Sequence, residues 1–217
     1  MPEIDLTTKK NVVKKQAVSV ELLKHRFPVV PGVKMENLKI TREGIYSITR
    51  PKDAQYMTDL LKNYFWDRKL SDLVITDATA NVGGNCINFA QYFARVNAVE
   101  LSLATCKILL NNLNQYHLLN KVYVYNCDYT QLYDKLQQDV VFIDPPWGGR
   151  GYNKKPQIYL ELSSMSISQL VNKLKGKTTL IMIKVPENFD FNRFYREQEF
   201  KSVHWYQIAN YRILVLY

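Results

Sequence analysis

From Pro51 to the C-terminus, segments of helical periodicity alternate with short apolar runs. Helix patterns cover residues 51–65, 85–95, 102–116 and 167–174, and apolar runs follow or separate them at residues 73–75, 98–99, 122–125, 140–143 and 179–183. Two further β-like runs, 203–208 and 212–216, have no helix pattern between them. The pattern predicts an α/β fold whose seven-stranded sheet is mostly parallel, with helices on both faces and a terminal antiparallel hairpin. Ligands of such sheets bind beyond the carboxyl ends of the strands, where site residues are therefore expected.

The residues before this alternation form a different region. Between positions 9 and 26 a single acid, Glu21, stands against six basic residues: Lys9, Lys10, Lys14, Lys15, Lys24 and Arg26. We therefore expect residues 1–50 to form a basic arm that contributes to substrate binding, with a helix near residues 18–24, and residues 51–217 to form the catalytic domain. A solvated tail is the alternative for the first fifteen residues.

Charge and cysteine content narrow the class of protein. The net charge of +9 favours an anionic partner such as nucleic acid, although a basic protein without such a partner has the same charge. The three cysteines form no C-x-x-C pair, which argues against a zinc site or a disulfide framework and indicates a reducing compartment, the cytoplasm or the nucleus. No run approaches the roughly 18 apolar residues of a membrane span, and no secretory signal is seen, so an intracellular protein without a membrane partner is expected.

The first two strand ends carry residues that suit a nucleoside. After the first strand, Asp77-Ala78-Thr79-Ala80-Asn81-Val82-Gly83-Gly84-Asn85 forms a turn whose two glycines let the backbone approach a ligand closely. Alone, this is an ordinary strand-to-helix turn. However, Glu100 lies 23 residues after Asp77, at the end of the second strand, where an acid can bind ribose hydroxyls.

The third and fourth strand ends add further polar groups. Asp128 is placed to hold an adenine amine, to cap a helix over residues 129–136, or to do both. The fourth strand ends in Asp144-Pro145-Pro146-Trp147. Proline lacks an amide N–H, so this turn presents acceptors only, the Asp144 carboxylate and the Pro145 carbonyl. Two fixed acceptors can bind both N–H groups of an exocyclic amine, while Trp147 stacks on the base. The alternative is a proline-stiffened loop with a core tryptophan.

Together these segments resemble class I S-adenosylmethionine-dependent methyltransferases, which have a Rossmann-like fold. The string Pro145-Pro146-Trp147-Gly148-Gly149-Arg150-Gly151-Tyr152 resembles a segment of the trimethylguanosine synthases, the RNA cap guanine 2-amino methyltransferases. Residues 38–49, LKITREGIYSIT, and the Val82-Gly83-Gly84-Asn85 turn resemble two further segments of that family.

The resemblance implies a set of roles. Asp144 and Pro145 would orient the reacting amine, and Trp147 would stack on a cationic 7-methylguanine. Lys39 and Tyr152 would contact cap phosphates. The donor S-adenosylmethionine would lie against Thr49, Asp77, Ala78, Thr79, Gly83, Gly84, Asn85, Glu100, Leu101, Asp128 and Tyr129. No metal is required. Capped RNA is the expected partner, and a monomer is favoured.

Two departures from the family leave questions open. Many members carry Ser where this chain has Asp144, and aspartate is also found there in adenine 6-amino methyltransferases. Glu187 stands where the family offers an arginine to phosphate, so Lys184 and Arg150 are candidates to replace it.

Three other functions remain to be weighed. The first is amino-methylation of another nucleobase, such as adenine in DNA or guanine in ribosomal or transfer RNA. The second is a catalytically silent RNA-binding module, against which the acceptor-only turn argues. The third is a nicotinamide-dependent oxidoreductase, against which the incomplete glycine fingerprint argues. A compact chain rich in lysine and asparagine is also compatible with a virus or with a parasite whose genome is AT-rich.

Overall fold

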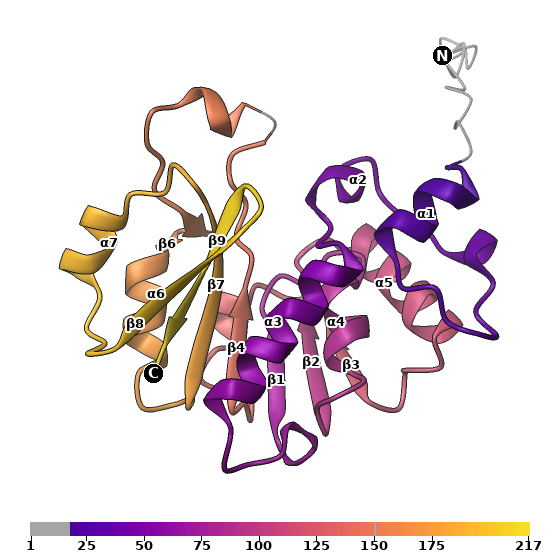
Figure 1. The fold of residues 1–217 in the computed structure, drawn as a ribbon, viewed down its shortest axis with the longest axis horizontal. Helices are drawn as coiled ribbons and strands as arrows, with labels where there is room; N and C mark the ends of the chain where they lie inside the picture. The colour runs from indigo at the N-terminus through magenta and orange to yellow at the C-terminus, as the bar shows by residue number, and fades with distance from the viewer. Residues whose placement is uncertain (1–17, 150) are drawn as a thin grey trace, which may run out of the picture.

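The computed structural model describes residues 18–149 and 151–217, which are arranged round a seven-stranded sheet (Figure 1). The strand order is β3-β2-β1-β4-β7-β9-β8. The strands are β1 (Val74–Asp77), β2 (Arg95–Val99), β3 (Val122–Tyr125), β4 (Val140–Ile143), β7 (Leu180–Pro186), β8 (Val203–Ile208) and β9 (Tyr211–Leu216). Two short strands, β5 (Glu161–Leu162) and β6 (Met165–Ser166), pair separately.

Strand direction agrees with the sequence pattern. The pairs β1–β2, β2–β3, β1–β4 and β4–β7 are parallel, whereas β9 runs antiparallel to both β7 and β8. The predicted α/β fold, with its terminal hairpin, is therefore confirmed. Because β1 has β2 on one side and β4 on the other, the direction of winding reverses between β1 and β4. The ends of these two strands are where such a sheet binds its ligand.

Helices cover both faces of the sheet. On one face lie α3 (Pro51–Tyr64), α4 (Gly84–Phe89) and α5 (Leu103–Gln115), and on the other lie α6 (Ile167–Leu174) and α7 (Phe191–Glu197). Strand β4 contributes buried side chains to the hydrophobic core on each face of the sheet. Val140 and Phe142 belong to the first core cluster, and Val141 and Ile143 belong to the second. This alternation explains why β4 is a continuous apolar run, as expected of a strand buried on both sides.

The described part of the N-terminal region packs on the first core. It contains α1 (Val20–Arg26), the 3-10 turn η1 (Met35–Asn37) and α2 (Gly44–Ser47). Leu23, Phe27 and Leu38 are buried in the same cluster as the sheet residues. The helix expected near residues 18–24 is thus confirmed as α1. The division at residue 50 stays a prediction, and Lys9, Lys10, Lys14 and Lys15 lie outside the described residues.

Two local predictions were wrong, and one helix was missed. The helix expected over residues 85–95 ends at Phe89, because the Ala94 N–H bonds to the Leu73 carbonyl and residues 95–99 pair with β1. The helix expected over residues 129–136 is only the 3-10 turn η3 (Tyr129–Gln131). Helix α7 was not predicted. Two further 3-10 turns are η2 (Leu70–Asp72) and η4 (Tyr152–Lys154). None of the helices in the described ranges has the length and apolar character that crossing a membrane requires.

Candidate active site

The turn after β1 brings the chain from the sheet into α4. Gly83 has a φ of +105°, a left-handed conformation that side chains rarely adopt. A Cβ on Gly84 would lie 2.5 Å from Ile48 Cγ1 and 3.1 Å from the Thr49 carbonyl oxygen. The second glycine therefore allows the segment before α3 to approach the turn closely, and this approach brings Thr49 to the end of the sheet.

Asp77 is fully buried at the base of this turn. Its carboxylate accepts hydrogen bonds from the Thr79 N–H at 3.2 Å and from Cys86 Sγ at 3.2 Å. Burial raises the pKa of Asp77 to about 7, and the negative charges of Asp144 and Glu100 act in the same direction, while the two hydrogen bonds oppose them. A cationic ligand beside Asp77 would stabilise its ionised form.

Glu100 is held rigidly at the end of β2. One carboxylate oxygen accepts from the Asn81 N–H at 3.0 Å and the other from the Ser102 N–H at 2.8 Å. Each oxygen keeps a lone pair beyond these bonds, as binding of ribose hydroxyls requires. The neighbouring Leu101 is largely exposed, which gives an apolar wall at the same place.

Asp128 follows β3 and caps η3. Its Oδ1 accepts from the Thr130 N–H at 2.9 Å and from the Thr130 hydroxyl at 2.8 Å. Partial burial raises the pKa of Asp128, but hydrogen bonds from Ser163 and Thr130 outweigh this and lower the pKa overall. Capping and adenine binding remain compatible, because each carboxylate oxygen can accept more than one hydrogen bond. Tyr129 is different: its side chain is buried and donates to Gln138 Oε1, so only its backbone lies at the strand end.

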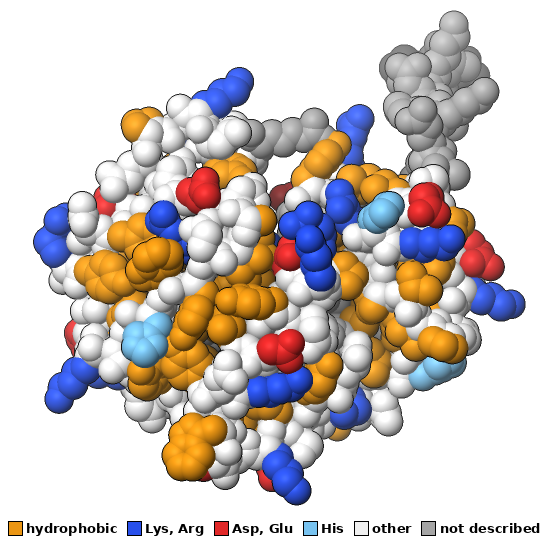
Figure 2. All heavy atoms as spheres, viewed as in Figure 1, with side chains coloured by type: hydrophobic (Ala, Val, Ile, Leu, Met, Phe, Trp, Pro, Cys, Tyr) orange, Lys and Arg blue, Asp and Glu red, His pale blue; other side chains and the backbone are white. Residues whose placement is uncertain are grey.

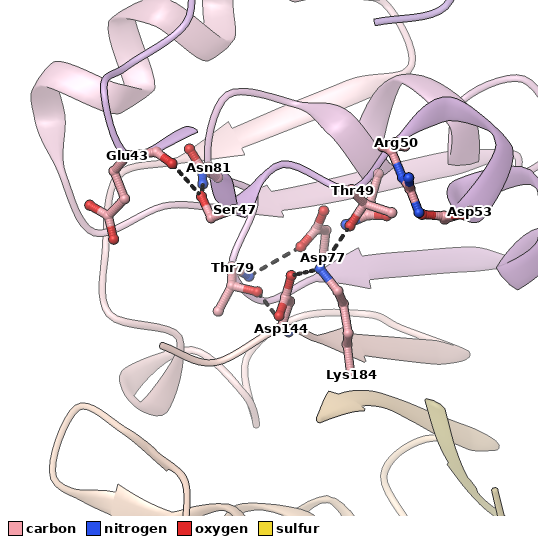
Figure 3. Close-up of polar contacts among 11 residues, drawn as sticks. Glu43, Ser47, Thr49, Arg50, Asp53, Asp77, Thr79, Asn81, Asp144 and Lys184 are labelled. Carbon is pink, nitrogen blue, oxygen red and sulfur yellow. Dashed lines mark hydrogen bonds and ion pairs between the residues drawn. The ribbon is translucent and has the colours of Figure 1, made fainter. Parts of the chain in front are cut away.

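The Asp144 carboxylate lies at the centre of a polar group drawn from distant parts of the chain (Figure 3). Its backbone N–H donates to Thr79 Oγ1 at 2.9 Å, and its Oδ2 accepts from Lys184 Nζ at 2.8 Å. Lys184 Nζ also lies 3.3 Å from Thr49 Oγ1, which in turn accepts from Asn85 Nδ2 at 3.2 Å. Burial raises the pKa of Asp144 and the Lys184 ammonium opposes this rise. Four predicted residues, Thr49, Thr79, Asn85 and Lys184, are thus brought to the predicted acceptor.

Trp147 extends this group with an aromatic surface. Its ring makes an edge contact with Tyr152, the centroids being 5.0 Å apart, and lies 6.3 Å from the ring of Tyr211. The indole Nε1 is buried and has no hydrogen-bond partner among the described residues. Pro145 is buried, and Gly148 and Gly149 both have positive φ, so the chain turns sharply after the tryptophan.

One predicted phosphate ligand, Lys39, lies apart from this group. Lys39 is exposed on the segment before α2, where its backbone N–H and carbonyl bond to the Asn112 side chain. Arg150 lies outside the described residues. Lys184, in contrast, is 6% exposed and faces Asp144.

The sequence did not point to Tyr211 or Asn188. Tyr211 begins β9 and places its ring 5.0 Å from Lys184 Nζ, while its buried hydroxyl has no geometric hydrogen-bond partner in the described chain. Asn188 Nδ2 donates to the carbonyl oxygens of Tyr152 at 3.0 Å and Lys155 at 2.8 Å, which fixes the segment after Trp147. Asn188 ends the segment that resembles the family's phosphate-binding stretch, but that resemblance does not reveal its contact with Tyr152, and Tyr211 lies in no motif.

Comparison with known proteins decides the family. The sequence profile described as RNA cap guanine-N2 methyltransferase matches residues 73–211, which include all four strand ends of the site. The chain belongs to this family. The methyltransferase is also 33% identical over 213 residues to an uncharacterized protein of Acanthamoeba polyphaga mimivirus, covering 88% of this chain and 83% of the relative.

More distant relatives have assigned names. The methyltransferase is 24% identical to the trimethylguanosine synthase of Saccharomyces cerevisiae, over 80% of this chain and 56% of that protein. It is 25% identical to the trimethylguanosine synthase of Schizosaccharomyces pombe, over 71% of this chain and 65% of that protein. The chain therefore spans 56% of the length of the first of these relatives and 65% of the second.

Solved structures show the same fold. A 16S rRNA N2 methyltransferase of T. thermophilus, solved with AdoMet and guanosine, superposes with a TM-score of 0.59 at 16% identity, covering 82% of this chain and 43% of that one. An RNA methyltransferase of Salinibacter ruber, solved with S-adenosyl-L-homocysteine, gives a TM-score of 0.51 at 14% identity, covering 77% of this chain and 91% of that one.

S-adenosylmethionine is the methyl donor of this family, and the residues present suit it. Asn85 Oδ1 is buried and has no hydrogen-bond partner among the described residues, so an acceptor is available beside the glycine turn. The carboxylates of Asp77 and Glu100 add negative charge to this site, which favours binding of a cationic methyl donor. Among the described residues, no three His, Cys, Asp or Glu side chains come together in a way that would hold a metal ion.

Proposed function

We propose that this methyltransferase transfers a methyl group to the exocyclic 2-amino group of the 7-methylguanosine cap of RNA. The observation that carries the proposal is the placement of an acceptor-only turn, Asp144 to Trp147, beside the glycine turn at the switch point of the sheet. Family membership and the two yeast relatives support the same substrate.

Binding of the base would rest on Trp147. A half-buried indole ring next to Tyr152 offers a surface on which a purine stacks, and stacking on an aromatic side chain is worth about 1–3 kcal/mol per base. A 7-methylated guanine is cationic, and a cation gains further from the negative face of the indole. Tyr152 and Lys39 are proposed to contact the cap phosphates.

Orientation of the amine would rest on Asp144 and Pro145. Lys184 engages Oδ2 of Asp144, which leaves Oδ1 to accept one N–H of the amine, while the Pro145 carbonyl accepts the other. Holding both N–H groups to one side turns the nitrogen lone pair toward the donor. S-adenosylmethionine supplies an electrophilic methyl carbon bonded to a sulfonium.

The reaction is then a single displacement. The nitrogen lone pair forms the new N–C bond as the C–S bond breaks, and S-adenosylhomocysteine leaves. The positive charge that develops on nitrogen is stabilised by the Asp144 carboxylate, which can accept the proton that the amine releases. Positioning and electrostatic stabilisation supply the rate acceleration, so no covalent enzyme intermediate is needed.

The second candidate is the same reaction on another nucleobase. It is favoured by Asp144 itself, which stands where many cap enzymes carry Ser, and by basic side chains that Figure 2 shows spread over one face, not gathered into a single patch. A dispersed positive surface suits a longer nucleic acid as well as a cap.

The test is transfer of label from S-adenosylmethionine to four acceptors: a 7-methylated cap dinucleotide, an unmethylated cap, uncapped RNA and DNA. Label in the 7-methylated cap alone supports the proposal, and analysis of the product nucleoside shows whether the 2-amino group carries it. Label in uncapped RNA or DNA instead overturns the cap assignment and keeps the methyltransferase. Donor binding without label in any acceptor favours a silent RNA-binding module.

A further inference from the structure

Lys184 is a charged residue in the middle of a buried strand. Every residue of β7 is buried, and Lys184 pairs in register with Ile213 of β9, between Ile183 and Val185. Only 7% of its side chain is exposed. Lysine is almost never fully buried without a partner, because removing an ammonium from water is costly. Its position therefore calls for a specific stabilising environment.

The surroundings of the ammonium supply one. Nζ lies 2.8 Å from Asp144 Oδ2 and 3.3 Å from Thr49 Oγ1. The ring centroids of Trp147 and Tyr211 lie 5.3 Å and 5.0 Å from the same atom, within the range of cation–π attraction. The ammonium thus contacts the proposed acceptor and the proposed stacking surface at once, and its burial favours this role over phosphate binding.

We infer that Lys184 is a positioning residue, which keeps the Asp144 carboxylate ionised and fixed so that it accepts a hydrogen bond from the amine. The inference deepens the proposed function, because it rests on the role given there to Asp144. It assigns to Lys184 no contact with the reacting atoms.

The physical reason is the protonation state of the acceptor. Burial favours the neutral acid form of Asp144, and a neutral acid would present an O–H donor where the amine also presents N–H donors. The other charged groups nearby do not correct this. Asp77, on β1, interacts with Asp144 as a like charge, while Arg50 is already engaged by Asp53. Tyr211, on β9, is a neutral phenol whose pKa is raised by burial. Lys184 is the described cation in direct contact with Asp144.

The first test requires no methyl acceptor. The protein is labelled with carbon-13 at the aspartate side-chain carboxyls, and the signals are followed by NMR as a function of pH. The Asp144 signal is the one lost in Asp144→Asn, and Asp77→Asn identifies the signal of its neighbour. Replacing Lys184 by Met should move the Asp144 titration upward by about 1–3 pH units, the range that an adjacent opposite charge produces. An unchanged titration overturns the inference, whatever the substrate proves to be.

The second test uses turnover on whichever acceptor the wild-type protein methylates. In Lys184→Met the rate should fall at least tenfold near neutral pH and recover as the pH is raised. In an Asp144→Asn background the same replacement should have less than a twofold effect, because an amide acceptor needs no counter-ion. An equal loss in both backgrounds overturns the inference. If the wild-type protein methylates no acceptor, the proposed function is contradicted. The NMR titration then decides the inference about Lys184.

Controls separate the charge effect from loss of folding. Lys62→Met removes an exposed lysine that lies 2.7 Å from Asp59, and should change neither the Asp144 titration nor turnover. Lys184→Gln keeps a hydrogen-bond donor without the charge and should behave as Lys184→Met does. If Lys184→Met unfolds, Lys184→Gln provides both measurements, and wild-type behaviour of a folded Lys184→Gln overturns the inference.

Discussion

The Thr79 hydroxyl oxygen accepts a hydrogen bond from the backbone N–H of Asp144 at 2.9 Å. The bond joins the turn after β1 to the turn after β4, across the switch point of the sheet. Because the Thr79 backbone N–H itself donates to Asp77, the proposed donor site and the proposed acceptor site are coupled through one residue. The distance between the two substrates therefore depends on a contact that belongs to neither.

Replacing Thr79 by Val should slow methyl transfer about tenfold. The change keeps the shape of the side chain but leaves the partly buried Asp144 N–H without its acceptor, at a cost of about 1–3 kcal/mol. Each 1.4 kcal/mol in the barrier is about tenfold in rate. Single-turnover kinetics with saturating donor measure the effect. Thr79→Ser keeps the acceptor and should retain most of the rate. A loss of rate in Thr79→Ser together with a wild-type rate in Thr79→Val would show that the methyl group of Thr79, not its oxygen, matters.

Replacing Trp147 by Ala should weaken binding of a 7-methylated cap dinucleotide at least fivefold. Removal of base stacking costs about 1–3 kcal/mol, and the loss should be greater for the 7-methylated than for the unmethylated cap, because only the former is cationic. Titration calorimetry with both dinucleotides gives the two affinities. Trp66→Ala is the matched control, since Trp66 is 86% exposed in the connection after α3. If wild-type protein binds both caps equally, the cation-sensing role of Trp147 is wrong.

The sheet could be predicted because strands that are buried on both faces appear in the sequence as continuous apolar runs. Strands such as 140–143 are unbroken apolar runs, and each ends where polar residues begin. Asp77, Glu100, Asp128 and Asp144 could be placed at one edge of the sheet for the same reason, since parallel strands end together.

The contacts that the sequence did not predict join residues that are far apart in the chain. Residues 90–95 continue a helical pattern, but residues 90–93 form turns, the Ala94 N–H bonds to the Leu73 carbonyl and Arg95 pairs with β1, because tertiary pairing outweighs local preference. The partnership of Lys184 with Asp144 joins two strands 40 residues apart in the chain. No rule of sequence spacing predicts this contact. No such rule predicts the contact of Tyr211 with Trp147 either.

Replacing Asp77 by Asn should stabilise the fold more at about pH 8 than at about pH 5. The folded-state pKa of Asp77 is about 7, above the ordinary value of 3.8, so between these values the folded protein holds a proton that the unfolded chain has released. Stability from this group is therefore fully present below the unfolded pKa of 3.8 and is lost as the pH rises from there through the folded pKa, by at most about 4 kcal/mol. Urea denaturation at the two pH values measures the difference.

The same variant should bind S-adenosylmethionine more weakly, since the introduced amide offers no negative charge to a cationic donor. Greater stability together with weaker donor binding is the expected combination at a functional site. A variant that is less stable than wild type at about pH 8 contradicts the assignment of a raised pKa to Asp77.

Replacing Asn188 by Ala should raise the KM for the capped substrate several-fold, and leave donor affinity unchanged. Asn188 fixes the segment after Trp147 through the carbonyl oxygens of Tyr152 and Lys155, at 3.0 and 2.8 Å. Without these bonds the proposed phosphate contact of Tyr152 is no longer held in place, and ordering the segment then costs binding free energy. Asn114→Ala, at an exposed position of α5, is the control and should leave KM unchanged. Steady-state kinetics varied separately in cap and donor decide the matter, since a rise in both KM values would indicate a general loss of structure and not a loosened cap segment.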